Sequence, residues 1–332
     1  QIASVRLGNQ VVRWDRTDEV SPLNIINPED VREGALPSRS SRKIAVPMVN
    51  VELETDTVFG QALFLPFFRP ARFDVTESDW ALFSHAERAG EVRVDRVNED
   101  WSLRPEFGGR AGVSLGQFDI AVDYFQTRDD VPSIGTIALT DPFDAANTRP
   151  SRLDLARAVI DADATVPLAF HSSSIAGLDF ETVWGSFGFR GDLAYTDRRQ
   201  FLDTALTAFE RSVADWVVGA DYNGPNELYL NLQFQQSLIL DYLPTTLFTD
   251  ELTSGVSGTV RKAFANRTLD AAVRFFYEVS NDSYYVNPYL EMKYWKNVTL
   301  GVGADLLGGR ETSTLGFYKD NSQMYLTTEV LF

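Results

Sequence analysis

The segment ELYLNLQFQQSLIL, residues 227–240, alternates between apolar and mostly polar side chains along its whole length. Leucine or phenylalanine occupies every second position from Leu228 to Leu240, with Gln236 as the exception. A period of two is that of a β-strand, in which successive side chains point to opposite faces. Strands of soluble proteins average about 5–6 residues, whereas a strand that crosses a membrane needs about 9–11. The segment therefore predicts a membrane-spanning strand with its apolar face toward lipid.

The same alternation recurs along the chain. The expected strands are residues 3–13, 46–54, 58–65, 106–115, 118–124, 178–184, 189–195, 216–222, 227–240, 254–264, 269–279, 287–294, 298–306 and 323–332. The last of these ends the chain on an aromatic residue, Phe332, which is typical of bacterial outer-membrane barrels. The pattern thus predicts about 14 strands, an even number as in most such barrels.

The connections between these strands alternate in length, which also favours a barrel. The short connections are 55–57, 115–117, 185–187, 223–227, 266–267 and 296–297, and all but one of the alternate connections are long. Outer-membrane barrels have short periplasmic turns and long extracellular loops, and lipid requires the sheet to close. We therefore predict an all-β fold in which residues 1–332 form a single transmembrane antiparallel up-and-down β-barrel. A soluble propeller is the alternative, but no fixed repeat supports it.

Composition narrows the class of protein further. The chain has 332 residues, no cysteine and a net charge of −17, from 47 acidic and 30 basic residues. This balance argues against a nucleic-acid partner, and the lack of cysteine excludes a cysteine-based zinc site. The chain opens at Gln1, so a processed product without a signal peptide is expected. We expect a location in the outer membrane of a Gram-negative bacterium, contact with its lipids and lipopolysaccharide, and no cofactor.

Two of the long loops have apolar residues at helical spacing. These are residues 151–162 and 198–211. A helix in such a loop could fold into the lumen and narrow it, or it could cap the extracellular mouth. The sequence leaves both arrangements open.

The segment RLGNQVVRWDRTDEVSPLNIINPEDVRE, residues 6–33, breaks the strand pattern. Its prolines, Pro22 and Pro28, cannot donate to a β-ladder and predict an ordered loop at the mouth or in the lumen. The residues that carry a resemblance are Leu7, Gly8, Gln10, Val11, Val12, Trp14, Asp18, Pro22, Leu23, Asn27, Pro28 and Asp30. With residues 44–48, they resemble a family of proteobacterial outer-membrane proteins of unknown function. Asp15 and Asn24 depart from its pattern.

The resemblance implies a porin-like barrel that works with inner-membrane transporters of the lipid-exporting superfamily, often beside lipid or sterol metabolism. Members of the family often have more sequence before this motif. The resemblance therefore makes 16 strands the alternative count.

Charged residues on the polar strand faces should line the lumen. They are Arg190, Arg274, Lys293, Asp179, Glu181, Asp270, Glu278 and Glu291. Opposed rows of acids and bases could orient polar solutes, as in a selective pore. Alternatively, the same charges could pair with one another and fill the barrel.

Three functions follow from these patterns. The first is a channel that passes small solutes or lipids through a polar lumen gated by the loops 14–45, 66–105 and 128–174. The second is a barrel component or scaffold of a larger envelope export complex with a protein partner, and a homo-oligomer is a further option. The third is an outer-membrane hydrolase using His171, but no triad accompanies it, so we expect no enzyme. Loop acids such as Asp129 and Asp130 could bind calcium weakly, although solvated charge is the favoured interpretation.

Overall fold

Fourteen antiparallel strands form one large sheet in the computed structural model. The structure describes residues 2–17, 19–34, 42–76, 78–84, 89–96, 102–140, 142–143, 149–295 and 297–331. In sheet order the strands are β1 (Ile2–Gln10), β2 (Val46–Glu54), β3 (Val58–Leu65), β5 (Glu106–Leu115), β6 (Phe118–Arg128), β9 (Ser172–Trp184), β10 (Phe187–Leu202), β11 (Ala208–Gly224), β12 (Leu228–Ile239), β13 (Leu252–Phe264), β14 (Leu269–Glu278), β15 (Ser283–Trp295), β16 (Val298–Gly309) and β17 (Gln323–Val330). Neighbours along the chain are neighbours in this sheet, which is the up-and-down topology predicted from the sequence.

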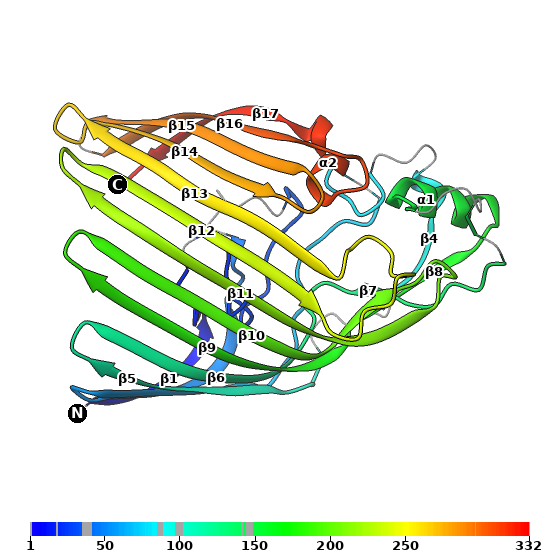
Figure 1. Ribbon diagram of the computed structural model, residues 1–332, viewed down its shortest axis with the longest axis horizontal. Coiled ribbons are helices and arrows are strands. Elements are labelled where there is room, and N and C mark those ends of the chain that lie inside the picture. The colour runs from blue at the N-terminus through cyan, green and yellow to red at the C-terminus, as the bar shows by residue number, and fades with distance from the viewer. Residues whose placement is uncertain are drawn as a thin grey trace.

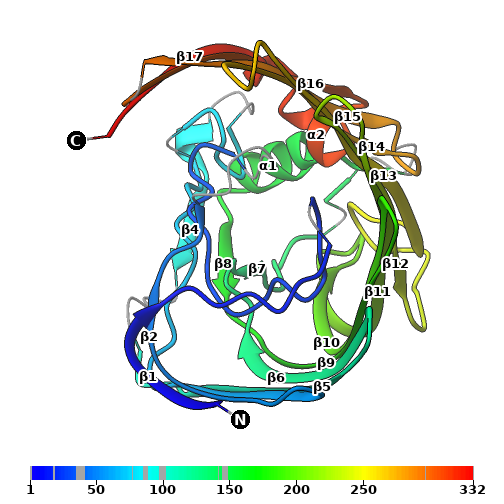
Figure 2. The same cartoon turned by 90° about the vertical axis from the view of Figure 1, so that its left-hand side faces the viewer.

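The sheet curls around a lumen and has the architecture of an outer-membrane β-barrel. Short turns gather at one end together with both chain termini, and the long connections gather at the other (Figure 1). Each predicted strand is present, so the expected fold class is confirmed. In the part of the chain that the structure describes, no ladder joins β1 to β17, and these two strands lie apart at the ends of the curl (Figure 2). Within the same ranges, no helix is long and apolar enough to cross a membrane.

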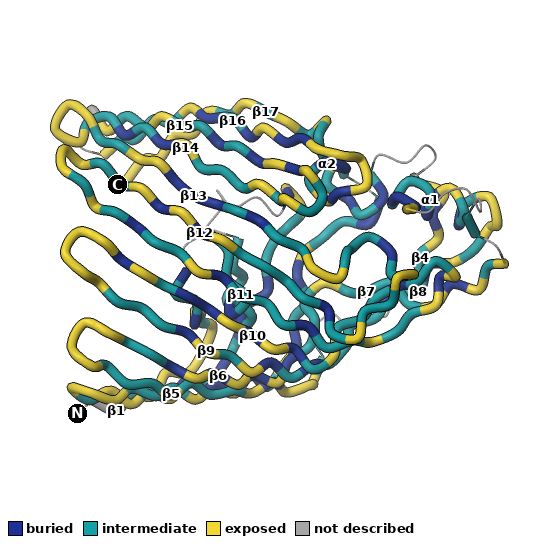
Figure 3. The backbone as a smooth tube through the Cα atoms, viewed as in Figure 1, coloured by how far each residue is buried: buried dark blue, intermediate teal, exposed yellow. Residues whose placement is uncertain are grey.

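The outer face of the sheet is apolar. Large exposed side chains on this face include Val122, Leu178, Leu193, Val218, Leu232, Phe234, Val260, Val273, Val302 and Leu326. Exposed turns mark one end of the molecule, whereas buried and half-buried positions recur along the strands (Figure 3). An apolar belt of this extent is typical of a surface that meets lipid.

A small cap with its own core covers the mouth at the long-loop end. It contains α1 (Arg152–Asp161), a short sheet of β4 (Arg93–Arg96), β8 (Thr165–Ala169) and β7 (Ser133–Ile134), and the 3-10 turn η2 (Ala89–Glu91). Ser151 and Asp154 form a capping box at the start of α1, and Leu155 and Val159 pack into the cap core with Val166 of β8. The helix expected at 151–162 is thus confirmed, and it lies over the mouth (Figures 1 and 2). Beside it, α2 (Thr314–Phe317) and η3 (Lys319–Asn321) lead into β17.

The prediction of a second helix, at residues 198–211, is wrong. This stretch forms the end of β10, a turn at residues 203–207 and the start of β11. Phe201 faces Phe209, and Leu202 faces Ala208, across this hairpin. Phe201, Ala205 and Phe209 are spaced four positions apart, which also places them near one face of a helix, so apolar spacing alone could not separate the two structures. The prediction of a long loop at 197–212 fails for the same reason. Expectations at Asp18, Lys296 and Phe332 fall outside the described residues.

Candidate passage through the lumen

The segment after β1 folds into the lumen. We call residues 11–33 the plug segment; Figure 2 shows this part of the chain crossing the inside of the curled sheet. Asn27 ties the two ends of the plug segment together. The Asn27 side-chain oxygen accepts from the Val12 amide at 2.8 Å, and the side-chain nitrogen donates to the carbonyls of Gln10 (2.9 Å) and Ile44 (3.0 Å). Of the two arrangements predicted for this ordered loop, the structure has the one in the lumen.

Apolar side chains seat the plug segment against one side of the wall. Trp14 is buried, donates from Nε1 to Gln61 at 2.6 Å, and meets the Phe125 ring edge-on at 5.8 Å. Leu23 is buried near Gly177 of β9, where a Cβ atom would collide with the leucine side chain. Apolar contacts thus hold the plug segment against β3, β6 and β9.

An ion-pair network joins the plug segment to the same side. Arg16 donates from Nε to Asp179 at 2.9 Å and from Nη1 to Glu181 at 3.1 Å. Asp192 of β10 accepts from the Thr17 amide at 3.1 Å and from the hydroxyls of Thr17 and Ser21, both at 2.6 Å. Hydrogen bonds to ionised groups are among the stronger ones in proteins, so this network holds the segment firmly.

Arginines of the strands complete the network. Arg110 lies 2.6 Å from Asp179, and Arg190 lies 3.1 Å from Glu181. Three residues predicted to line the lumen, Asp179, Glu181 and Arg190, thus come together here. The sequence analysis missed Arg16 and Asp192 as members of this site. Arg16 stands in a loop, where strand alternation gives no direction, although its place inside the resembling motif was a usable signal.

The other predicted lumen residues lie away from the plug contacts. Asp270 pairs with Arg261, and Lys293 lies 2.6 Å from Glu291. Glu278 accepts hydrogen bonds from Asn281 (2.6 Å) and Ser283 (2.9 Å), and the Arg274 guanidinium lies 5.0 Å from the centre of the Tyr289 ring. Pairing within the wall therefore accounts for much of the predicted lumen charge.

Glu19 connects the plug segment to the opposite side of the lumen. Its backbone amide donates to Gln233 of β12 at 3.3 Å, and its carboxylate accepts from the hydroxyl of Thr259 on β13. By alternation, residues 229, 231, 233, 235 and 237 of β12 face the lumen. The odd-numbered residues from 253 to 263 of β13 face it as well. Glu19 therefore touches the middle of both inner faces.

A cavity lies on each side of this contact. The upper cavity, toward the long loops, has a volume of about 280 Å³ and includes Ser237, Gln235 and Gly255 in its lining. The lower cavity, toward the short turns, has a volume of about 850 Å³ and includes Tyr229 and Arg261. Both use the inner faces of β12 and β13, and the Glu19 contacts to Gln233 and Thr259 lie between their linings along these strands.

A buried lysine supports the base of the plug segment. The Lys43 ammonium donates to the carbonyls of Asn24 (3.1 Å) and Asn27 (2.9 Å) and lies 3.6 Å from Glu29. Burial lowers the pKa of Lys43 from its usual value, while the nearby Glu29 opposes that shift. The ammonium is thus a fixed part of the loop that enters the lumen.

His171 gives no support to a hydrolytic site. Its Nδ1 lies 3.8 Å from Glu210, and among the described residues its Nε2 has no hydrogen-bond partner. A Ser–His–Asp mechanism needs a serine hydroxyl within hydrogen-bond reach of the ring. Likewise, the described residues contain no group of three or more acidic, histidine or cysteine side chains placed to hold a metal ion.

The family model "Protein of unknown function (DUF1302)" matches residues 1–330, so the chain belongs to this family. No curated protein is significantly similar to it. Among solved structures, the toluene transporter TbuX of Ralstonia pickettii is 9% identical with a TM-score of 0.37, covering 80% of this chain and 77% of that one. A mutant ferric enterobactin receptor, PfeA of Pseudomonas aeruginosa, is 10% identical with a TM-score of 0.32, covering 80% of this chain and 49% of the receptor.

Proposed function

We propose that the protein is an outer-membrane channel that passes small solutes through its polar lumen, gated by the plug segment at Glu19. One observation carries the proposal: Glu19 separates two cavities that share the inner faces of β12 and β13. A solute moving along these strands would meet amide and hydroxyl side chains above Glu19 and charged side chains below it. Such a wall suits polar solutes, because it offers hydrogen bonds in place of water.

The gate has a physical basis in the uneven attachment of the plug segment. Toward β9 and β10 it is held by Arg16, Thr17 and Ser21, each bound to a wall carboxylate. Toward β12 and β13, the hydrogen bonds that the structure shows for the described residues of the segment come from Glu19. Opening the route along β12 and β13 therefore requires fewer hydrogen bonds to break than removing the whole segment.

Three of the predicted lumen residues lie on this route. Glu278 lines the upper cavity, and Asp270 and Lys293 line the lower one. These are the predicted charges that a passing ion would meet. The remaining five belong to pairs in the wall or beneath the plug segment.

Single-channel recording in a planar bilayer, under a salt gradient, tests the proposal. The purified protein should give small conductance steps, and Glu19→Ala should enlarge them, because the carboxylate and its contact to Thr259 are lost. Glu311→Ala is the matched control, since Glu311 pairs with Lys319 on an exposed loop (2.8 Å). It should leave the steps unchanged.

Folding of each variant is checked by heat-modifiable gel mobility, so that silence can be separated from misfolding. Folded protein that inserts without conducting, both as the natural sequence and as Glu19→Ala, would overturn the channel proposal. Equal enlargement by Glu311→Ala would overturn the role given to Glu19.

A further inference from the structure

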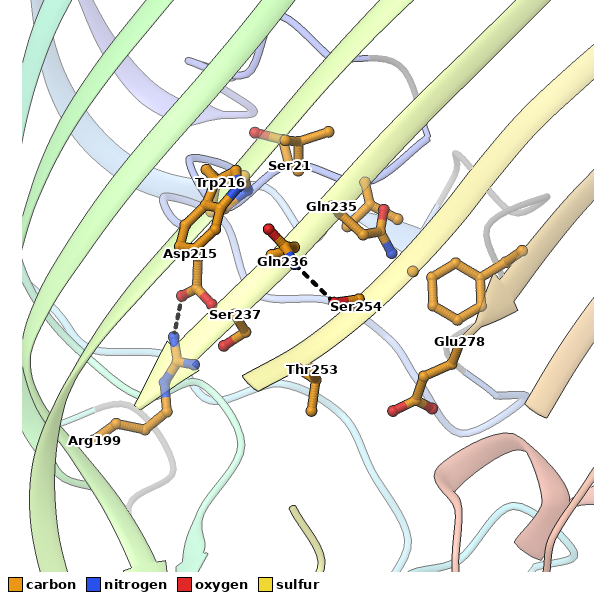
Figure 4. Close-up of a pocket in the computed structure, with 15 residues that line it drawn as sticks. Ser21, Arg199, Asp215, Trp216, Gln235, Gln236, Ser237, Thr253, Ser254 and Glu278 are labelled. Carbon is orange, nitrogen blue, oxygen red and sulfur yellow. Dashed lines mark hydrogen bonds and ion pairs between the residues drawn. The ribbon is translucent and has the colours of Figure 1, made fainter. Parts of the chain in front are cut away.

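The upper cavity combines polar side chains with an apolar patch. From the wall, Arg199, Asp215, Gln235, Ser237 and Thr253 contribute polar groups, and Glu278 closes one edge (Figure 4). Val217 of β11, Phe276 of β14 and Pro22 of the plug segment contribute the apolar part. Its volume of about 280 Å³ lies just below the usual range of small-molecule sites, about 300–1,000 Å³.

Several polar groups in this cavity have hydrogen-bonding capacity to spare. Among the described residues, the only hydrogen bond of the Gln235 side chain is a long one from Ser257, at 3.5 Å. The hydroxyls of Ser237 and Thr253 have no protein partner within the same ranges. An amide offers two donors and an acceptor, and each hydroxyl can donate and accept. A ligand with several hydroxyl groups would match this set.

The charges around the cavity are already engaged. Arg199 donates to Asp215 at 2.8 Å, as Figure 4 shows. Glu278 accepts from Asn281 at 2.6 Å and from Ser283 at 2.9 Å. An ionic ligand would have to displace one of these partners, whereas a neutral one would not. The paired guanidinium and carboxylate still present a donor and an acceptor side by side, which suits neighbouring hydroxyl groups.

The cavity also has room for a ring. Gly255 keeps the β13 wall flat there, since a Cβ atom would lie only 3.1 Å from the Gln235 amide nitrogen. The Phe276 ring and the buried Val217 offer an apolar surface on which the C–H face of a saturated ring can rest. Hydroxyl-matching groups and an apolar resting surface in one compact cavity are the two requirements of a sugar site.

We propose that the upper cavity binds a neutral sugar of monosaccharide size, which makes it a substrate subsite of the channel. The inference rests on the proposed transport function, because the cavity lies on the route that Glu19 interrupts. It adds to that function the chemical class of the solute.

Calorimetric titration of the purified protein with D-glucose tests the proposal, in a detergent without a sugar headgroup. Cyclohexanol serves as the comparison, because it has a six-membered ring and one hydroxyl. Glucose should bind saturably and more tightly than cyclohexanol. Gln235→Leu, which removes the amide at similar volume, should weaken glucose binding about fivefold, as expected for one lost hydrogen bond.

A glutamine elsewhere in the wall supplies the matched control. Gln323 of β17 donates to Asp305 at 3.1 Å and does not line the upper cavity, so Gln323→Leu should leave glucose affinity unchanged. Ser237→Ala is a second, smaller change within the cavity and should also weaken binding, which guards against a folding defect in Gln235→Leu.

Two results would overturn the sugar site: cyclohexanol binding as tightly as glucose, or no loss of affinity in both Gln235→Leu and Ser237→Ala. Conductance is recorded on the same preparations. A conducting protein without glucose binding overturns the sugar site and leaves the channel intact. Glucose binding in a folded but silent protein supports the sugar site and overturns the channel.

Discussion

Asn27 is one of the supports of the plug segment, and removal of its side chain has a calculable effect. Its buried side chain makes three hydrogen bonds of 2.8–3.0 Å, to Val12, Gln10 and Ile44, and so joins the two ends of the segment. A buried hydrogen bond contributes about 1 kcal/mol net, so Asn27→Ala should weaken the seating of the segment by about 3 kcal/mol. At about 1.4 kcal/mol per tenfold, the segment should open roughly two orders of magnitude more often.

Hydrogen exchange followed by mass spectrometry measures this opening. The amides of Arg16 and Thr17, which donate to Asp192 at 3.2 and 3.1 Å, should lose protection in Asn27→Ala, whereas the amides of β12 should keep theirs. Asn24→Ala is the control in the same loop, because the Asn24 side chain makes one long hydrogen bond, 3.5 Å to Glu29. Unchanged exchange at Arg16 and Thr17, or equal effects of both variants, would refute the reasoning.

Two further predictions concern the same segment. Gly177→Ala should push Leu23 aside and destabilise the plug segment by about 1–3 kcal/mol. Gly60→Ala should not, because a Cβ atom there meets only a carbonyl at 3.6 Å. Hydrogen exchange of the segment's amides in the two variants measures the difference. Burial lowers the pKa of Lys43, so between that lowered value and the ordinary 10.5 the unfolded chain binds more protons. The free energy of unfolding, measured in urea, should therefore rise with pH through that window, and this gain should be lost as pH falls. Lys43→Met should abolish the dependence.

The strands could be predicted from the sequence because their cause is local. Each residue of β12 faces lipid or lumen by its position alone, so alternation from Leu228 to Phe234 carries the information. Loop lengths likewise separated an end with short turns from an end with long connections. The cap sheet of β4, β7 and β8 was missed, since its strands have only two to five residues and show no readable period.

The candidate site was only half predictable, because its contacts join distant parts of the chain. Alternation assigned Asp179, Glu181 and Arg190 to the polar face, but Arg16 reaches Asp179 across 163 positions. The Glu19 contact with Thr259 spans 240 positions. No local pattern encodes such a pairing, and the prolines near it predict an ordered loop without saying where that loop lies.

The two sides of the lumen differ in chemistry, and under the proposed channel function this difference favours one side as the route. Toward β6, β9 and β10 the wall presents carboxylates, and burying them requires partners such as Arg16. Withdrawal of the plug segment from that side would leave charges unpaired. Toward β12 and β13 the wall presents amides and hydroxyls such as Gln233 and Thr259, which water or a polar solute can satisfy at little cost. A polar solute that displaces Glu19 can itself bond to Gln233 and Thr259, whereas one that displaces Arg16 must compensate the buried charge of Asp179.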